Sequence, residues 1–131
     1  MERNIVVLAH DKKKPDLVSL LTEVQEWLWQ RTIVATGRSA EALEEGDFKV
    51  PVKHLSPGKS GGYQEIVEMI NEGKVNIVIF LRDHEVTHNH QDIQDLLVAC
   101  NINNVPLATN KASAKLLILG LLQFEKTHGR R

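Results

Sequence analysis

The sequence predicts an α/β fold: a doubly wound, mostly parallel sheet of about five strands with helices on both of its faces. Short β-branched runs alternate with longer segments in which apolar residues recur every three or four positions, the pattern of a strand and helix repeat. The candidate strands are apolar throughout, as strands buried on both faces of a parallel sheet are. Polar residues gather where these strands end, which is where ligands bind in such sheets.

The first half of the chain supplies three strands and two helices. A continuous apolar run predicts a buried strand at residues 5–9, and apolar positions three and four apart predict a helix over Asp16 to Trp29. A strand at 32–35, closed by a Thr-Gly pair, follows. A short helix at 40–45 then leads to a third strand near 50–54.

The second half repeats the alternation. A helix over 63–72 follows a glycine-rich loop and ends at Gly73, which has the position of the glycine that commonly follows a helix. The strand at 75–81 is the most hydrophobic of the chain. The remaining elements are a helix at 91–101, a strand at 106–109 and a helix at 113–125. Since no linker or internal repeat interrupts the pattern, we expect one domain over residues 1–131.

Composition and charge limit the classes of function. The chain has 131 residues and a formal net charge of -1, which gives no electrostatic basis for binding nucleic acid or an anionic membrane. No apolar run approaches the roughly 20 residues of a membrane span, and we expect a cytoplasmic protein without a signal peptide. The single cysteine, Cys100, lies in an apolar run, so we expect a small buried hydrophobe rather than a reactive thiol.

The loop before the predicted helix at 63–72 resembles a phosphate-binding loop. Gly61 and Gly62 follow the segment Ser56-Pro57-Gly58-Lys59-Ser60 and precede a helix. Adjacent glycines let backbone N–H groups approach an anion, and a helix N-terminus adds partial positive charge. The next residue is Tyr63, whose phenol, with an ordinary pKa of about 10, is a poor general base at neutral pH.

Polar residues at the other strand ends extend this candidate site. In chain order they are His10, Asp11, Lys12, Lys13 and Lys14; Thr36, Gly37, Arg38 and Ser39; Arg82 and Asp83; and Thr109, Asn110 and Lys111. Each alone is compatible with an ordinary turn or a solvated face. Their coincidence at one edge of the sheet predicts a binding site for a small anion.

These segments resemble the methylglyoxal synthase family. The resemblance rests on Val6-Val7-Leu8-Ala9-His10-Asp11 with Lys14, Ala35-Thr36-Gly37, Leu55-Ser56 before Gly61-Gly62, Asn71-Glu72-Gly73-Lys74 before Ile77-Val78-Ile79-Phe80, Asp83, and Val105-Pro106-Leu107-Ala108-Thr109-Asn110. It extends from about Ile5 to Ala114. It implies an α/β domain that eliminates phosphate from dihydroxyacetone phosphate through an enediolate, needs no metal or other cofactor, and forms a homohexamer.

The resemblance also assigns roles to individual residues. The phosphate ligands it implies are Lys14, Thr36, Gly37, Ser39, Ser56, Gly61 and Gly62. His10 and Asp11 would stand beside the carbonyl end of the substrate, and Asp83 matches a carboxylate of the family's active site.

A histidine segment of the family is one residue shorter in this chain. Either His88 or His90 could therefore take the place of the family's electrophilic histidine, while Asp92 matches its aspartate. Together with His84 these side chains also suggest a metal site. Because no Glu or Cys completes a ligand set, and alternating histidines on a polar loop more often stay solvated, we expect no metal.

Tyr63 marks the main departure from the family pattern, which has the carboxylate base directly after the two glycines. We therefore expect a protein that binds a small phosphorylated metabolite, with catalysis weak or absent. The alternative is an active synthase that uses Asp11 or Asp83 as its base. A purely structural oligomer is a third possibility, but it would leave the cationic site without a use.

Two tryptophans in the first helix suggest an oligomer. Trp27 and Trp29 are two residues apart, so in a helix their side chains point about 200° apart and cannot both face the core. We expect one of them to contact another subunit.

Overall fold

A five-stranded sheet forms the centre of the molecule. The computed structural model describes residues 4–86 and 90–128. The strands are β1 (Asn4–Ala9), β2 (Thr32–Thr36), β3 (Val52–Leu55), β4 (Val75–Leu81) and β5 (Leu107–Ala108). They lie in the order β3-β2-β1-β4-β5, and every neighbouring pair is parallel. The predicted α/β class and parallel sheet are confirmed.

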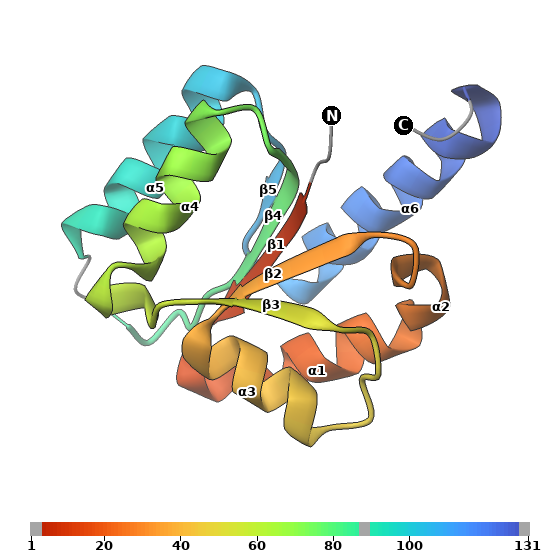
Figure 1. The fold of residues 1–131 in the computed structure, drawn as a ribbon, viewed down its shortest axis with the longest axis horizontal. Helices are drawn as coiled ribbons and strands as arrows, with labels where there is room; N and C mark the ends of the chain where they lie inside the picture. Colours follow the sequence, from red (N-terminus) through yellow and green to blue (C-terminus); the bar gives the residue numbers. More distant parts are fainter. Residues whose placement is uncertain (1–3, 87–89, 129–131) are drawn as a thin grey trace.

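Helices cover both faces of the sheet (Figure 1). The helices are α1 (Lys14–Glu23), α2 (Gln25–Leu28), α3 (Gly37–Glu45), α4 (Gly62–Asn71), α5 (Gln91–Asn103) and α6 (Lys111–His128), with short 3-10 turns η1 (Asp11–Lys13) and η2 (Gly58–Ser60). Helices α4 and α5 pack on one face, whereas α1, α3 and α6 pack on the other.

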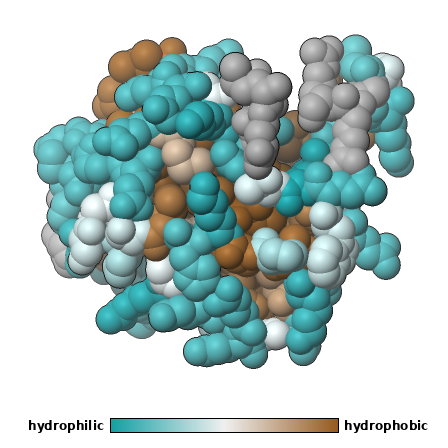
Figure 2. Space-filling model, viewed as in Figure 1, coloured by the Kyte–Doolittle hydropathy of each residue, from teal (hydrophilic) through white to brown (hydrophobic). Residues whose placement is uncertain are grey.

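The central strand β1 separates two apolar layers. All six of its residues are buried, and their side chains alternate between the faces because the side-chain period of a strand is two. Ile5 and Val7 belong to the layer under α1, α3 and α6, and Val6 and Leu8 belong to the layer under α4 and α5. In Figure 2, hydrophilic residues cover most of the outer surface, apolar residues are visible between the two helix layers, and a further apolar group lies at the upper left edge.

The strand order determines where a crevice forms at the edge of the sheet. The chain runs outward from β1 through β2 to β3 and then crosses to the other side of β1, so the winding reverses between β1 and β4. A crevice forms at the carboxyl ends of the strands at such a reversal. The backbone N–H of His10 donates to Leu81 O at 3.0 Å, so the residues that follow these two strands are neighbours.

The predicted first helix is interrupted. At Val24 the backbone leaves the helical region (φ -113°, ψ 15°), which separates α1 from α2. Two β-branched residues near the break, Thr22 and Val24, lower the local helix propensity. Trp27 packs against the core while Trp29 is 51 % exposed. The expectation that both tryptophans cannot face the core is confirmed.

A largely buried ion pair binds the end of α6 to the segment between α2 and β2. The Arg31 guanidinium pairs with the Glu125 carboxylate, and both side chains are mostly buried. Trp27 Nε1 donates to the same carboxylate oxygen at 3.1 Å. This contact joins residues that are 94 positions apart in the chain.

Gly73 ends α4 as predicted. Its φ is 74°, in the left-handed region that glycine adopts at little cost. Gly73 N–H donates to Ile70 O and Lys74 N–H donates to Met69 O, each at 3.0 Å, which is the hydrogen-bond pattern of a Schellman motif.

Cys100 is a buried hydrophobe, as the sequence predicts. Only 2 % of its surface is exposed, and burial raises its pKa to about 11. Within the described ranges, no helix has both the length and the apolar character needed to cross a membrane.

Candidate functional site

A cleft of about 600 Å³ lies at the carboxyl ends of β1, β2 and β4, closed on one side by the loop that follows β3. Its lining consists of Leu8, Ala9, His10, Asp11, Lys12, Lys14, Thr36, Arg38, Pro57, Gly58, Lys59, Ser60, Tyr63, Asp83, Val86, His90 and Ile93. Four of these side chains are cationic (Lys12, Lys14, Arg38 and Lys59), and two are carboxylates. The excess of positive charge favours an anionic ligand.

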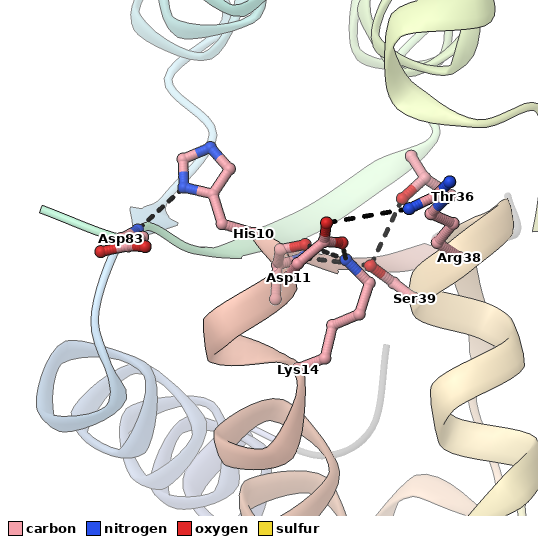
Figure 3. Close-up of polar contacts among 8 residues, drawn as sticks. His10, Asp11, Lys14, Thr36, Arg38, Ser39 and Asp83 are labelled. Atoms are coloured by element: carbon pink, nitrogen blue, oxygen red, sulfur yellow. Dashed lines mark hydrogen bonds and ion pairs between the residues drawn. The ribbon is translucent and has the colours of Figure 1, made fainter. Parts of the chain in front are cut away.

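Lys14, Asp11 and Arg38 form a group of paired charges on one side of the cleft (Figure 3). Lys14 is the first residue of α1, and its Nζ folds back to donate to Ala9 O at 2.8 Å and to Asp11 Oδ1 at 2.9 Å. Arg38 lies 3.7 Å from Asp11 Oδ2. The hydrogen bond from Lys14 lowers the pKa of Asp11 below its ordinary value, so this carboxylate is ionised and is a weakened base.

Thr36 and Ser39 connect the ends of β1 and β2. Ser39 Oγ accepts the backbone N–H of Ala9 at 3.1 Å, and Thr36 Oγ1 donates to Ser39 Oγ at 3.5 Å. Ser39 is 1 % exposed. Thr36 therefore faces the cleft, whereas the Ser39 hydroxyl lies beneath it (Figure 3).

His10 presents a neutral imidazole to the cleft. Its Nδ1 accepts the backbone N–H of Asp83 at 2.8 Å, so the neutral ring carries its proton on Nε2. Burial of the ring, and then the charge of Arg82, lower the pKa of His10 below its ordinary value. At neutral pH this histidine is an uncharged hydrogen-bond donor.

Asp83 also lines the cleft, and in Figure 3 His10 lies between it and the group formed by Asp11 and Lys14. Its Oδ1 accepts the backbone N–H of Glu85 at 3.0 Å. That hydrogen bond lowers the pKa of Asp83, so the carboxylate is ionised at neutral pH. Its hydrogen-bond partner is a neutral amide, and the charges of Lys12 and Lys13 lower its pKa less than that amide does, whereas Asp11 is held directly by two cations.

His90 contributes a second imidazole from the start of α5. It caps this helix, because its Nδ1 accepts the backbone N–H of Asp92 at 3.1 Å. The neutral ring again carries its proton on Nε2. Asp92 itself is bound by Gln64, whose Nε2 donates to Oδ1 at 2.9 Å. The alternative candidate, His88, lies outside the described residues.

Tyr63 forms an aromatic wall of the cleft. Its ring stacks on Phe80 with centroids 6.0 Å apart and lies 6.1 Å from the His90 ring. The side chain is 7 % exposed, and burial raises the pKa of its phenol. A Cβ on Gly58 would lie 2.6 Å from Tyr63 Cζ, so the loop after β3 packs directly on this ring.

The glycine pair is needed for local packing. A Cβ on Gly62 would lie 2.2 Å from Ser56 O, a distance that no side chain tolerates. Gly61 has a φ of 112° and precedes α4. Ser56 donates its backbone N–H to Glu65 Oε1 at 2.9 Å and its hydroxyl to Glu65 Oε2 at 2.8 Å.

The structure brings together about half of the predicted site residues. His10, Asp11, Lys14, Thr36, Tyr63, Asp83 and His90 all line the cleft. Gly37, Ser39, Ser56, Gly61, Gly62 and Asp92 adjoin it without being part of its lining.

Several lining residues were not among the candidates chosen from the sequence. Lys12 and Arg38 belonged to the polar clusters at the strand ends, and Lys59 to the glycine-rich loop, so a count of cations at this edge could have found them. Val86 and Ile93 carried no such signal. Among residues 4–86 and 90–128, no group of three or more His, Cys, Asp or Glu side chains is arranged to hold a metal ion.

Comparisons with known proteins agree with the geometry. Residues 16–109 match the family model described as MGS-like domain. The chain is 41 % identical over 122 residues to a methylglyoxal synthase of Cupriavidus pinatubonensis, covering 92 % of this chain and 93 % of that protein. It is 40 % identical over 119 residues to one of Thermoanaerobacterium thermosaccharolyticum, covering 90 % and 88 %. The crystal structure of methylglyoxal synthase from Elizabethkingia anophelis superposes with a TM-score of 0.80 at 32 % identity, covering 88 % of this chain and 76 % of that one.

Proposed function

Because this chain belongs to the methylglyoxal synthase family, we propose that it binds dihydroxyacetone phosphate in the cleft and eliminates inorganic phosphate to give methylglyoxal. The observation that carries this proposal is the identity of about 40 % to methylglyoxal synthases over nine tenths of the chain. The charge of the cleft and its polar side chains support the same substrate class.

The phosphate group is proposed to bind beside Lys14 and Thr36. Lys14 Nζ supplies a positive charge that is largely shielded from water, with a side chain only 16 % exposed, and Thr36 supplies a hydroxyl. Hydrogen bonds to charged groups are stronger than neutral ones. The remaining proposed contributors are Gly37, Ser39, Ser56, Gly61 and Gly62, which adjoin the cleft.

The two imidazoles are proposed to bind the carbonyl end of the substrate. His10 and His90 both accept backbone N–H groups at Nδ1, so each can donate from Nε2. A base removes a proton from the hydroxymethyl carbon next to the carbonyl, and the electron pair forms an enediolate whose oxygen these donors stabilise. The C–O bond to phosphate then breaks, phosphate leaves, and the resulting enol becomes methylglyoxal.

We propose Asp83 as the base, with Asp11 as the other candidate. Tyr63 stands at the position where the family pattern has its carboxylate, and the raised pKa of its phenol makes it unfit for this role. Asp11 is held in its ionised form by Lys14 and lies at the exposed rim. Asp83 lines the cleft, and its pKa is lowered chiefly by a neutral N–H at Oδ1 rather than by a directly bound cation.

Binding without turnover is the second candidate function. It is favoured by one observation, the neutral, buried phenol of Tyr63 beside the cleft. A site that lacks a well-positioned base loses about 10²–10⁴-fold in rate but keeps its electrostatic affinity for phosphate. Such a protein would act as a sensor of phosphorylated metabolites.

Methylglyoxal formation from dihydroxyacetone phosphate tests the proposal. We expect turnover by the wild type, loss of about 10²-fold or more in Asp83→Asn, and little change in Asp47→Asn, an exposed carboxylate that does not line the cleft. Loss in Asp11→Asn instead would make Asp11 the base. Phosphate binding with no turnover by the wild type would favour the sensor.

We also propose that the chain assembles as a homohexamer, as its family resemblance implies. Leu116 and Leu119, one turn apart on α6, are 71 % and 59 % exposed, and Trp29 is also exposed. Large apolar side chains gathered on a surface are typical of subunit contacts. Light scattering at micromolar concentration tests the assembly, and a monomer there would contradict it. The cytoplasmic location expected from the sequence stays a prediction.

A further inference from the structure

We infer that the Glu65 carboxylate occupies the hydrogen-bond donors of Ser56, at the start of the glycine loop, as a bound anion would. Glu65 thereby competes with phosphate for these donors and sets the affinity of the site. This inference rests on the proposed function, because it concerns the same anion site. It assigns a specificity-determining role to a residue that does not line the cleft.

The contacts of Glu65 are those of a bound anion. Each of its carboxylate oxygens accepts one donor of Ser56: Oε1 accepts the backbone N–H at 2.9 Å and Oε2 accepts the hydroxyl at 2.8 Å. A serine hydroxyl and a neighbouring backbone N–H are groups with which proteins commonly bind phosphate. In this chain both donors are already in use.

The carboxylate also lies next to the glycine pair. A Cβ built on Gly61 would have Glu65 Oε2 as its neighbour at 4.0 Å. Glu65 belongs to the first turn of α4, a ten-residue helix, where the partial positive charge of the N-terminus stabilises a carboxylate. The side chain therefore lies where an anion bound by Ser56 and the helix N-terminus would lie.

Two further backbone donors of the loop are also in use. The N–H groups of Ser60 and Gly62 both donate to Pro57 O, at 2.9 and 3.0 Å, and Pro57 has no N–H. The two donors of Ser56 therefore add to those that the loop can offer to a ligand only when Glu65 releases them. A phosphate and a carboxylate cannot share them, since both are acceptors and like charges repel.

Titration calorimetry of the full chain with inorganic phosphate tests this inference. Glu65→Gln keeps the size of the side chain and removes its charge, and we expect phosphate to bind about tenfold or more tightly than to the wild type. Glu65→Ala removes the acceptors as well and should give at least the same gain. In the double variant Glu65→Gln with Ser56→Ala the gain should be smaller than in Glu65→Gln, because the freed hydroxyl is gone while the backbone N–H remains.

Glu68→Gln is the matched control. Glu68 lies on the same helix and is exposed, so its substitution removes the same charge without freeing Ser56, and its affinity should stay near that of the wild type. Equal affinities of the wild type, Glu65→Gln and Glu65→Ala would overturn the inference while leaving the phosphate site intact. An equal gain in Glu68→Gln would also overturn it. Absence of phosphate binding in every variant would overturn the proposed function together with this inference.

Discussion

Substitution of Tyr63 by Phe removes the hydroxyl group and keeps the aromatic ring. Phe keeps the stacking on Phe80 and the packing on Gly58, so the shape of the cleft is retained. With an ordinary pKa of about 10, roughly one phenol in 1,000 is ionised at pH 7. Burial raises the pKa of Tyr63 further, which makes the phenolate rarer still.

This low population predicts a small kinetic effect. We expect Tyr63→Phe to form methylglyoxal within about twofold of the wild-type kcat/KM, whereas loss of a true general base costs about 10²–10⁴-fold. The assay is turnover of dihydroxyacetone phosphate between pH 6 and 9. A loss of 100-fold in Tyr63→Phe, with a wild-type rate that climbs steeply toward pH 9, would refute the reasoning. Tyr63→Asp is a second variant for the same assay. We expect it to be more active than the wild type because it supplies a carboxylate at this position.

Three further perturbations test other contacts. Lys14→Ala should weaken phosphate binding by about 1.5–3 kcal/mol in calorimetry, the range for a hydrogen bond to a charged group, and an unchanged affinity would remove Lys14 from the site. Glu125→Ala should lower the free energy of unfolding by about 3 kcal/mol, because the mostly buried Arg31 loses this carboxylate; urea denaturation measures it, and a change below about 0.5 kcal/mol would contradict the burial argument. His10 has a folded-state pKa below the ordinary 6.5. As the pH falls, His10 therefore becomes protonated in the unfolded chain before it does in the folded chain. The stability advantage of the wild type over His10→Gln should therefore be full above pH 6.5 and shrink below it, and an advantage that grows on acidification would contradict the sign.

The fold was predictable from the sequence because its signals are local. The continuous apolar runs of β1 and β4 and the glycine at position 73 determine their elements with no help from distant residues. The clustering of His10, Asp11, Lys14, Thr36 and Asp83 in one cleft was predictable as well, since the carboxyl ends of parallel strands share one edge.

The hydrogen-bond and ion-pair partners of individual side chains could not be predicted from the sequence. Ser56 could have faced the cleft or Glu65, and only the packing of the loop on α4 decides for Glu65. The Ser39 hydroxyl likewise binds the backbone of β1, although its position in the sequence suggests a ligand. The pairing of Arg31 with Glu125 depends on the direction of α6. Sequence patterns give the position of a side chain but not which of several nearby partners it selects.

The backbone contacts of His10 and His90 have a consequence for ligand affinity. Each imidazole is held at Nδ1 by a backbone N–H, that of Asp83 for His10 and that of Asp92 for His90, so its rotation is restricted before any ligand arrives. Ordering a mobile side chain on association costs about 0.5–1.5 kcal/mol. For these two rings that conformational entropy is lost when the chain folds, and a ligand carbonyl meets two donors whose directions are already fixed.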